Sequence, residues 1–170
     1  MNLPGNYKIL IITLSDRAFR GEYSDLSGPL IEERLKEFFD EQEWDSSFRT
    51  VLIPDTPDTL DKLLTDSADS YDFIFTTGGT GIGPNDITVD TISPKLTKEI
   101  PGIMEFIRIK YGTTNPSALL SRGIAGIIGN TLVYTLPGSV KAVNEYMTEI
   151  IKTLRHTILM LYGIDSHARH

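Results

Sequence analysis

Cysteine is absent from this 170-residue sequence, which excludes disulfide bonds, iron–sulfur clusters and thiolate zinc sites. Basic residues are also few, since 16 Lys and Arg stand against 23 Asp and Glu and give a net charge of −7. This balance argues against a nucleic-acid partner, because such proteins bind phosphates through Lys and Arg. A small anionic ligand is still compatible with it, because a local pocket of backbone N–H groups is enough to bind one.

Long apolar runs are missing as well, and none approaches the ~20 residues that cross a bilayer. The first fourteen residues place Pro4, Gly5 and Lys8 ahead of a short apolar stretch, unlike a secretory signal. We therefore expect a cytoplasmic protein that does not bind membranes. The length is typical of one domain, so a single domain is predicted over residues 1–170.

The pattern of the apolar runs predicts an α/β fold. Tyr7–Leu14 is an unbroken, β-branched run typical of a strand buried on both faces, which favours a parallel sheet. Thr50–Ile53 and Tyr71–Phe75 are expected as further strands of this sheet. Helices are expected between the strands, one opening at Ser27 and one capped by Asp58.

The second half of the chain adds a hairpin and a long helix to this pattern. Gly123–Ile128 and Thr131–Leu136 flank Gly129-Asn130, a two-residue hairpin signal that predicts an antiparallel strand at one edge. Residues 140–161 repeat apolar side chains at helical spacing. Together these elements predict a three-layer fold, with helices on both faces of a mostly parallel central sheet.

Two segments are expected to be less regular. Asp16–Asp25 is predicted as a loop between the first strand and the first helix. Thr91–Lys110 is predicted to be helical in parts, with interruptions at Pro94 and at Pro101-Gly102, because proline removes a backbone donor and breaks a helix.

The most informative segment is Thr76–Thr88, which follows a buried strand and carries four glycines. Open α/β sheets bind ligands at this edge, and glycines let backbone N–H groups turn toward a bulky anion. The segment is neither a Walker loop nor a dinucleotide-binding fingerprint, and its alternative interpretation is a turn that serves only geometry. The ligand residues predicted here are Thr77, Gly78, Gly79, Thr80, Gly81 and Thr88.

Two aspartates lie where phosphate chemistry would need them. Asp55 follows the strand Thr50–Ile53, and Asp86 ends the glycine-rich segment, so both are expected at the same edge of the sheet. A carboxylate beside a phosphate is repulsive unless a divalent cation lies between them, and Mg²⁺ is the usual ion. Asp55 and Asp86 are therefore predicted as catalytic residues and Mg²⁺ ligands, with a turn as the alternative for Asp55.

Three further segments carry polar groups that could contact a ligand. Leu14–Arg17 ends the first strand and reaches the same edge of the sheet, with Arg17 as the only nearby cation. Leu136–Ser139 joins the hairpin to the last helix and presents donors at a helix N-terminus. Asn115–Arg122 carries hydroxyls and the guanidinium of Arg122. A plain turn or cap is the alternative for each. The candidates in these segments are Ser15, Asp16, Ser117, Pro137, Gly138 and Ser139.

In their order and spacing, these segments resemble the MogA/MoaB family, the molybdopterin adenylyltransferases and their relatives, which include the Cnx and gephyrin G domains. The resemblance covers nearly the whole chain, from about residue 8 to residue 161. It implies a three-layer α/β fold, usually a homotrimer, and a step in molybdenum cofactor synthesis. The segments that carry it are Leu14–Arg17, Ile53–Asp55, Thr76–Asp86, Pro101-Gly102, Leu120–Arg122 and Leu136–Gly138.

The reaction that the resemblance implies is the transfer of AMP from ATP to the terminal phosphate of molybdopterin. Pyrophosphate is released, and the product is ready for molybdate insertion by a partner enzyme. Asp55 and Asp86 match the acidic positions that the family uses for catalysis and Mg²⁺, and Gly78–Gly81 match its phosphate loop. Asn85 stands where many members have arginine, and Val89 replaces a common proline.

The alternative function is a protein that binds and delivers molybdopterin without transferring AMP. Asp55 and Asp86 favour the enzyme, because a carrier has little use for two carboxylates beside an anionic ligand. Asn85 favours the carrier, because the arginine that it replaces would bind nucleotide phosphate.

Overall fold

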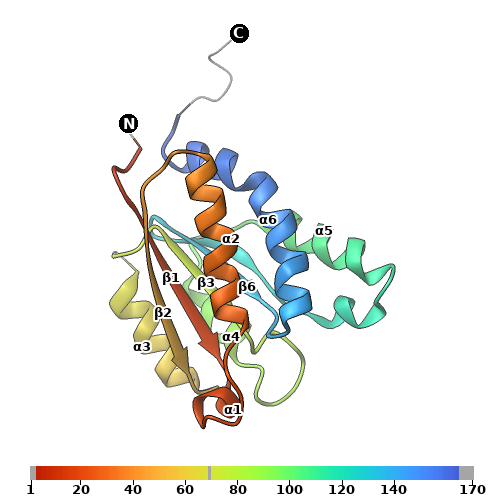
Figure 1. Cartoon of the computed structure of the whole chain (residues 1–170). Coiled ribbons are helices and arrows are strands. Elements are labelled where there is room, and N and C mark those ends of the chain that lie inside the picture. Colours follow the sequence, from red (N-terminus) through yellow and green to blue (C-terminus); the bar gives the residue numbers. More distant parts are fainter. Residues whose placement is uncertain (1–2, 69, 165–170) are drawn as a thin grey trace.

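Strands and helices alternate along the chain, and the computed structural model describes residues 3–68 and 70–164 (Figure 1). The strands are β1 (Tyr7–Leu14), β2 (Ser46–Ile53), β3 (Phe73–Thr77), β4 (Lys98–Glu99), β5 (Ala125–Ile128) and β6 (Thr131–Leu136). The helices are α1 (Asp16–Phe19), α2 (Ser27–Glu41), α3 (Pro57–Ser67), α4 (Thr88–Ile92), α5 (Pro101–Gly112) and α6 (Val140–Leu161). The 3₁₀ helices are η1 (Ser93–Lys95) and η2 (Pro116–Leu120).

The strands form one sheet in the order β2-β1-β3-β6-β5-β4. β2, β1, β3 and β6 run parallel, whereas β5 is antiparallel to both of its neighbours. The mostly parallel sheet with an antiparallel strand near one edge is therefore confirmed. The hairpin is confirmed as well, since Gly129 and Asn130 join β5 to β6, and Gly129 has the positive φ, 59°, that such turns need.

Helices cover both faces of this sheet, which confirms the three-layer arrangement. One core lies under α2, α5 and α6, and the other lies under α3 and α4. Figure 1 shows α2 and α6 side by side across the first of these faces. β1 contributes to both cores, because Ile9 and Ile11 join the first while Leu10 and Ile12 join the second. Burial on both faces explains its unbroken apolar run.

Four strand predictions differ from the structure. β5 begins at Ala125, two residues after the predicted Gly123. β2 begins four residues before the predicted Thr50, at Ser46, because it pairs with β1 along its whole length. β3 runs from Phe73 to Thr77, two residues later than predicted at each end, so its last threonines belong to the sheet. β4 is not predicted at all, because two residues are too few to show an alternating pattern.

Helix boundaries also need correction. The segment after β1 begins with the short helix α1, where a loop was predicted. Asp58 does not cap α3, because Thr56 is the N-cap and Pro57 the first helical residue. Pro101 begins α5 and does not interrupt it, since the fixed φ of proline suits a first helical position.

The parallel strands end together at one edge of the sheet. Leu14 of β1 pairs with Ile53 of β2, and Thr13 and Leu136 are the register partners of Thr77. The segments that follow β1, β2, β3 and β6 therefore start side by side, as the sequence predicts. Over residues 3–68 and 70–164, no helix has both the length and the apolar character to cross a membrane.

Candidate active site

A cavity of about 240 Å³ opens where the four strand ends meet. Residues from all four segments line it, and most of them carry hydroxyl, carboxylate or backbone polar groups. The predicted site residues that line this cavity are Ser15, Asp55, Thr77, Gly79, Asp86 and Gly138.

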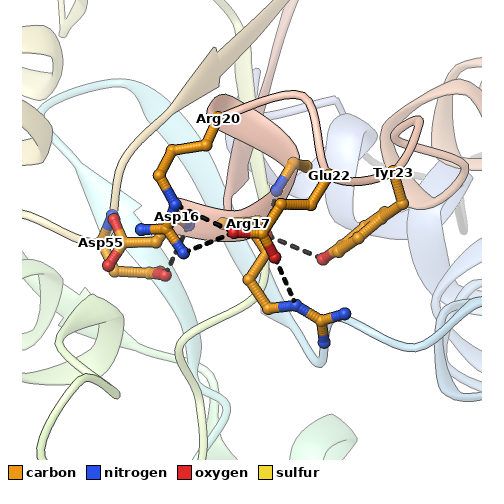
Figure 2. Close-up of polar contacts among 8 residues, drawn as sticks. Asp16, Arg17, Arg20, Glu22, Tyr23 and Asp55 are labelled. Carbon is orange, nitrogen blue, oxygen red and sulfur yellow. Dashed lines mark hydrogen bonds and ion pairs between the residues drawn. The ribbon is translucent and has the colours of Figure 1, made fainter.

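Asp55 is fixed by a reciprocal pair of hydrogen bonds with Asp16. The backbone N–H of Asp16 donates to Asp55 Oδ2 over 2.9 Å, and the N–H of Asp55 donates to Asp16 Oδ1 over 3.0 Å. Figure 2 shows the two residues facing each other at the start of α1. These bonds tie the end of β1 to the end of β2 and hold the Asp55 carboxylate at the cavity wall.

The electrostatic environment of Asp55 suits a cation. Burial raises the pKa of its carboxyl, and the negative charges of Asp16 and Asp86 raise it further, against the hydrogen bond from the Asp16 backbone, which lowers it. Asp86 lines the same cavity. A bound divalent cation would relieve the repulsion between these carboxylates.

Asp55→Asn is expected to increase the free energy of unfolding at pH 7. The raised pKa means that the folded state binds the proton more tightly than the unfolded chain, so ionisation costs stability as the pH rises through the folded pKa. Asparagine keeps the acceptor for the Asp16 N–H and removes the charge. Because Asp55 is partly exposed, the gain should stay below about 1 kcal/mol.

Urea unfolding of the metal-free protein at pH 7 and below pH 4 measures this effect. The gain should shrink progressively at the lower pH, as the wild-type carboxyl becomes protonated first in the folded and then in the unfolded state. The control is Asp66→Asn on the exposed face of α3, which should show no gain. A gain that is equal at both pH values would contradict this electrostatic account.

The glycine loop, residues 78–88, starts with two residues in the left-handed region, Gly78 (φ 101°) and Gly79 (φ 66°). The N–H of Gly78 donates to the carbonyl of Leu136 over 3.0 Å. A Cβ at position 78 would lie 2.2 Å from the carbonyl oxygen of Leu14. Glycine is therefore required here, because the loop begins between the ends of β1 and β6.

Thr88 holds the other end of the glycine loop. Its hydroxyl donates to the carbonyl of Gly78 over 2.8 Å, and its N–H donates to the carbonyl of Gly79 over 3.1 Å. The side chain is fully buried, so we assign it to holding the loop in place of the predicted ligand contact. A Cβ at Gly79 would lie 2.4 Å from this hydroxyl, which explains the second glycine.

Backbone donors for an anion come from two neighbouring places. In the described part of the chain, the N–H groups of Gly79 and Gly81 make no hydrogen bond. The N-terminus of the 22-residue helix α6 lies beside them, since a Cβ at Gly138 would be 3.4 Å from the Cα of Gly78. Free N–H groups and the positive end of a helix dipole are the usual means of binding phosphate.

The carboxylate of Asp86 lies over the glycine loop. Its Oδ2 accepts from the N–H of Gly83 over 2.7 Å. A Cβ at Gly81 would lie 2.6 Å from the same oxygen, so the carboxylate approaches the backbone more closely than another residue would allow. Asp86 thus lies against the glycine loop and also lines the cavity that it shares with Asp55.

Arg122, which is not among the predicted site residues, contacts the loop from outside. Its Nε donates to the carbonyl of Gly81 (2.7 Å), its Nη2 donates to the carbonyl of Asp86 (3.0 Å), and its N–H donates to the carbonyl of Thr80 (2.8 Å). The guanidinium also pairs with Asp90. Sequence spacing could not reveal these contacts, because about 40 residues separate Arg122 from the loop.

The prediction that Arg17 is the only nearby cation is wrong. Arg20 follows it, and both guanidinium groups bind Glu22, with distances of 3.1 Å from Arg17 and 2.9 Å from Arg20 (Figure 2). The Arg17 guanidinium also lies 5.1 Å from the centre of the Tyr23 ring. Glu22 thus compensates positive charge at this side of the cavity.

Several other predicted residues hold the segments together. Ser15 caps α1 by accepting from the N–H of Ala18, Thr77 donates to the carbonyl of Pro137 over 2.8 Å, and Ser139 caps α6. The hydroxyl of Thr80 is buried and lies 3.4 Å from that of Ser121.

Ser117 is not among the residues that line the cavity. It lies in η2, where its hydroxyl donates to the side chain of Asn115 over 2.6 Å.

Sequence reasoning did not identify Asp25 as part of the cavity wall. One of its oxygens accepts from the N–H groups of Ser27 (2.9 Å) and Gly28 (3.2 Å), and the other accepts from the hydroxyl of Thr13 (2.6 Å). Asp25 precedes the N-cap Leu26, accepts from the first two N–H groups of α2, and ties the helix to β1. The available signal was an aspartate two residues before a helix start, which is typical of such caps.

Comparison with known proteins places this site in a family context. The family described as "Probable molybdopterin binding domain" matches residues 10–156. A molybdopterin adenylyltransferase of Pyrococcus furiosus is 36% identical over 170 residues, covering 98% of this chain and 94% of that protein. One of Helicobacter pylori is 33% identical over 155 residues, covering 90% of this chain and 86% of its own.

A longer relative shows that the chain also corresponds to part of larger proteins. It is 35% identical to a molybdenum cofactor biosynthesis bifunctional protein of Chlorobaculum tepidum, but spans only 49% of that protein. Among solved structures, MogA superposes with a TM-score of 0.81 at 33% identity, over 91% of this chain and 99% of that one. The tungsten cofactor synthesizing protein MoaB of Pyrococcus furiosus gives 0.80 at 33%, over 93% and 98%.

Proposed function

Since the chain belongs to the molybdopterin-binding family that its sequence resembles, a family of molybdenum cofactor biosynthesis, we propose that it is a molybdopterin adenylyltransferase. The observation that carries this proposal is the shared cavity of Asp55 and Asp86, beside the unpaired N–H groups of the glycine loop. A binding protein needs such donors but gains nothing from two carboxylates that repel an anion. An enzyme that aligns two phosphate groups needs both the N–H donors and a pair of carboxylates that can hold a cation.

The proposed reaction joins two anions. An oxygen of the terminal phosphate of molybdopterin attacks the α-phosphorus of ATP, and a new P–O bond forms. The bond from that phosphorus to the oxygen bridging the α- and β-phosphates breaks, and pyrophosphate leaves with this oxygen and the electron pair. Catalysis is then mainly in-line positioning and charge neutralisation, because a phosphate nucleophile is already ionised near pH 7.

The residues present fit a Mg²⁺ ion at Asp55 and Asp86. Carboxylate oxygens are the ligands that this ion prefers, and the pKa of Asp55 is raised first by burial and then by the negative charges of Asp16 and Asp86. Mg²⁺ bound there would neutralise phosphate charge and stabilise the leaving pyrophosphate. The backbone N–H groups of Gly79 and Gly81 and of the α6 N-terminus bind and orient the phosphates.

A carrier without transferase activity is the second candidate. Asn85 lies in the cavity wall next to Asp86, at the position where many members of the family have arginine. Without that cation, nucleotide phosphate would be bound less tightly.

Incubation with molybdopterin, ATP and Mg²⁺, followed by mass analysis of the pterin, distinguishes the two functions. The enzyme produces adenylylated pterin and pyrophosphate in equal amounts, and chelation of the metal abolishes both products. A carrier binds molybdopterin and leaves ATP intact.

We further propose that the protein is a homotrimer, with the active site largely within each subunit. A groove of about 570 Å³ between α5 and α6 is lined by the apolar side chains of Ile100, Ile103 and Phe106 on one side and by charged and hydroxyl side chains of α6 on the other. Phe106, which lines this groove, and Ile109 on the same helix are 52% and 65% exposed, so an apolar surface of a second subunit that entered the groove would cover them together.

Phe106→Glu combined with Ile109→Glu should therefore convert trimers into monomers at micromolar concentration, because charged side chains oppose apolar packing. Sedimentation velocity measures the change. Phe19→Glu, which replaces an exposed phenylalanine on α1, is the control and should leave the assembly unchanged. A wild-type monomer would refute the trimer without affecting the site assignment.

We also propose that the protein is cytoplasmic and works with a partner enzyme that inserts molybdate. A cytoplasmic location fits an enzyme that uses ATP as co-substrate. A partner that inserts molybdate fits the chemistry of the product. The bifunctional relative is consistent with a second activity acting beside this one, since its match leaves about half of that protein unaccounted for.

A further inference from the structure

The glycine loop is closed by a side chain that comes from another part of the chain. Arg122 donates from its Nε to the carbonyl of Gly81 and from its Nη2 to the carbonyl of Asp86, over 2.7 and 3.0 Å. Its own N–H donates to the carbonyl of Thr80 over 2.8 Å. One residue therefore binds the loop backbone on both sides of its tip.

Asp90 adds an ion pair on the outer side of the guanidinium. Its two carboxylate oxygens accept from Nη1 and Nη2 of Arg122 over 2.9 and 3.0 Å. The Asp90 side chain is 70% exposed, so the ion pair by itself contributes little. The planar guanidinium is held mainly by its own bonds from Nε and Nη2 to the loop carbonyls, a geometry that lysine cannot reproduce.

The segment that carries Arg122 is itself anchored to the core. The hydroxyl of Tyr146, a buried residue of α6, donates to Ser121 Oγ over 3.0 Å. The same oxygen lies 3.4 Å from the hydroxyl of Thr80 and accepts from the N–H of Gly123. Arg122 thus projects from a fixed support.

We propose that Arg122 is a positioning residue, which holds the glycine loop so that the Asp86 carboxylate and the free N–H groups of the loop face the cavity. The guanidinium is bound to the loop backbone and to Asp90, so it acts through the loop. The proposal rests on the proposed function only where AMP transfer is concerned. Order of the loop and affinity for molybdopterin can be measured whether or not AMP is transferred.

The first test is hydrogen exchange of the loop amides in Arg122→Ala. The amides of Gly83, Asp86 and Thr88 are each hydrogen bonded in the closed loop. They should exchange about tenfold faster in the variant, while the amides of β1 should be unchanged. Arg122→Lys should give an intermediate rate and provides the same comparison if the alanine variant does not fold. Unchanged exchange in the loop would overturn the proposal.

The second test is single-turnover AMP transfer with chemical rescue. Arg122→Ala should lower the rate about a hundredfold, because a loop displaced by about 1 Å misplaces the reacting groups. Added guanidinium chloride at non-denaturing concentration should restore at least about tenfold of this loss. Lack of rescue together with a normal loop would mean that Arg122 only forms a surface ion pair.

Two matched variants separate the loop contacts from other effects. Asp90→Ala removes the ion pair and should slow transfer less than about fivefold, since the carbonyl contacts persist. A loss as large as that of Arg122→Ala would contradict the proposal. Arg155→Ala, on the exposed part of α6 about 23 Å along the helix from its start, is the control for loss of an arginine. If the wild-type protein transfers no AMP, the proposed function fails, and the exchange rates still decide the role of Arg122.

Discussion

Asp86→Asn is expected to lower the rate of AMP transfer about a thousandfold, or about 4 kcal/mol of transition-state stabilisation. The substitution removes the charge and little else. Asparagine can still accept the hydrogen bond from Gly83, and the contact of Arg122 is with the backbone carbonyl, so the loop keeps its conformation. The lost activity would therefore report the missing negative charge, and with it the missing metal ligand.

Asp55→Asn should cost a similar factor, because its carboxylate serves the same proposed ion. The double variant should be little worse than either single one, since residues that act on one ion act as a unit. Molybdopterin affinity should stay the same or rise, because the glycine loop supplies the donors and a repulsive charge is gone.

Single-turnover transfer at saturating pterin and ATP, with a thermal melt of each variant, measures these effects. Asp66→Asn, an exposed aspartate of α3, is the control and should transfer AMP at the wild-type rate. Undiminished transfer in Asp55→Asn or Asp86→Asn would mean that the replaced residue only shapes a turn.

Gly78→Ala should produce the largest loss of stability among single glycine substitutions in the loop. Its φ of 101° is strained for any other residue, at a cost of about 1–3 kcal/mol. The new Cβ would also meet the Leu14 carbonyl oxygen at 2.2 Å, and because this oxygen belongs to the backbone of β1, the strand itself must shift. Together these effects predict a loss of about 3 kcal/mol or more.

A melting temperature lowered by roughly 6–12 °C, at fixed protein concentration, is the expected readout for a domain of this size. Gly163→Ala isolates the strain from the collision, since Gly163 has a φ of 63° but no neighbouring atom within 4 Å of a new Cβ. That variant should lose only about 1 kcal/mol. Equal losses in the two variants would show that the collision with β1 is absorbed without cost.

The sequence is most informative where the strands are buried on both faces. β1 is predicted residue for residue, because every position from Ile9 to Leu14 is buried and only Lys8 is exposed, so the strand has no exposed face that would resemble a loop. β2 is predicted only over its last four residues, since an edge strand with exposed positions carries serine, threonine and arginine that resemble a loop. Asp55 and Asp86 are brought to one cavity because parallel strands end at one edge, a rule that holds before any coordinates are known.

The sequence could not reveal which polar residues face the cavity and which hold the backbone in place. Thr77 and Thr88 were expected to donate to a ligand, but both hydroxyls donate to backbone carbonyls inside the fold. Arg122 holds the glycine loop through contacts with residues about 40 positions away. Asp25 holds the start of α2 through contacts with its own backbone neighbours. Composition and spacing give the same residue types for either role, and only the three-dimensional contacts separate them.

ATP labelled at its α-phosphate tests the central claim most directly. The protein is saturated with molybdopterin, mixed with labelled ATP and Mg²⁺, and stopped within one turnover. The proposed enzyme moves the label onto the pterin and releases unlabelled pyrophosphate in equal amount. Label that stays in ATP while molybdopterin is bound at full occupancy would contradict the transferase and identify the protein as a carrier.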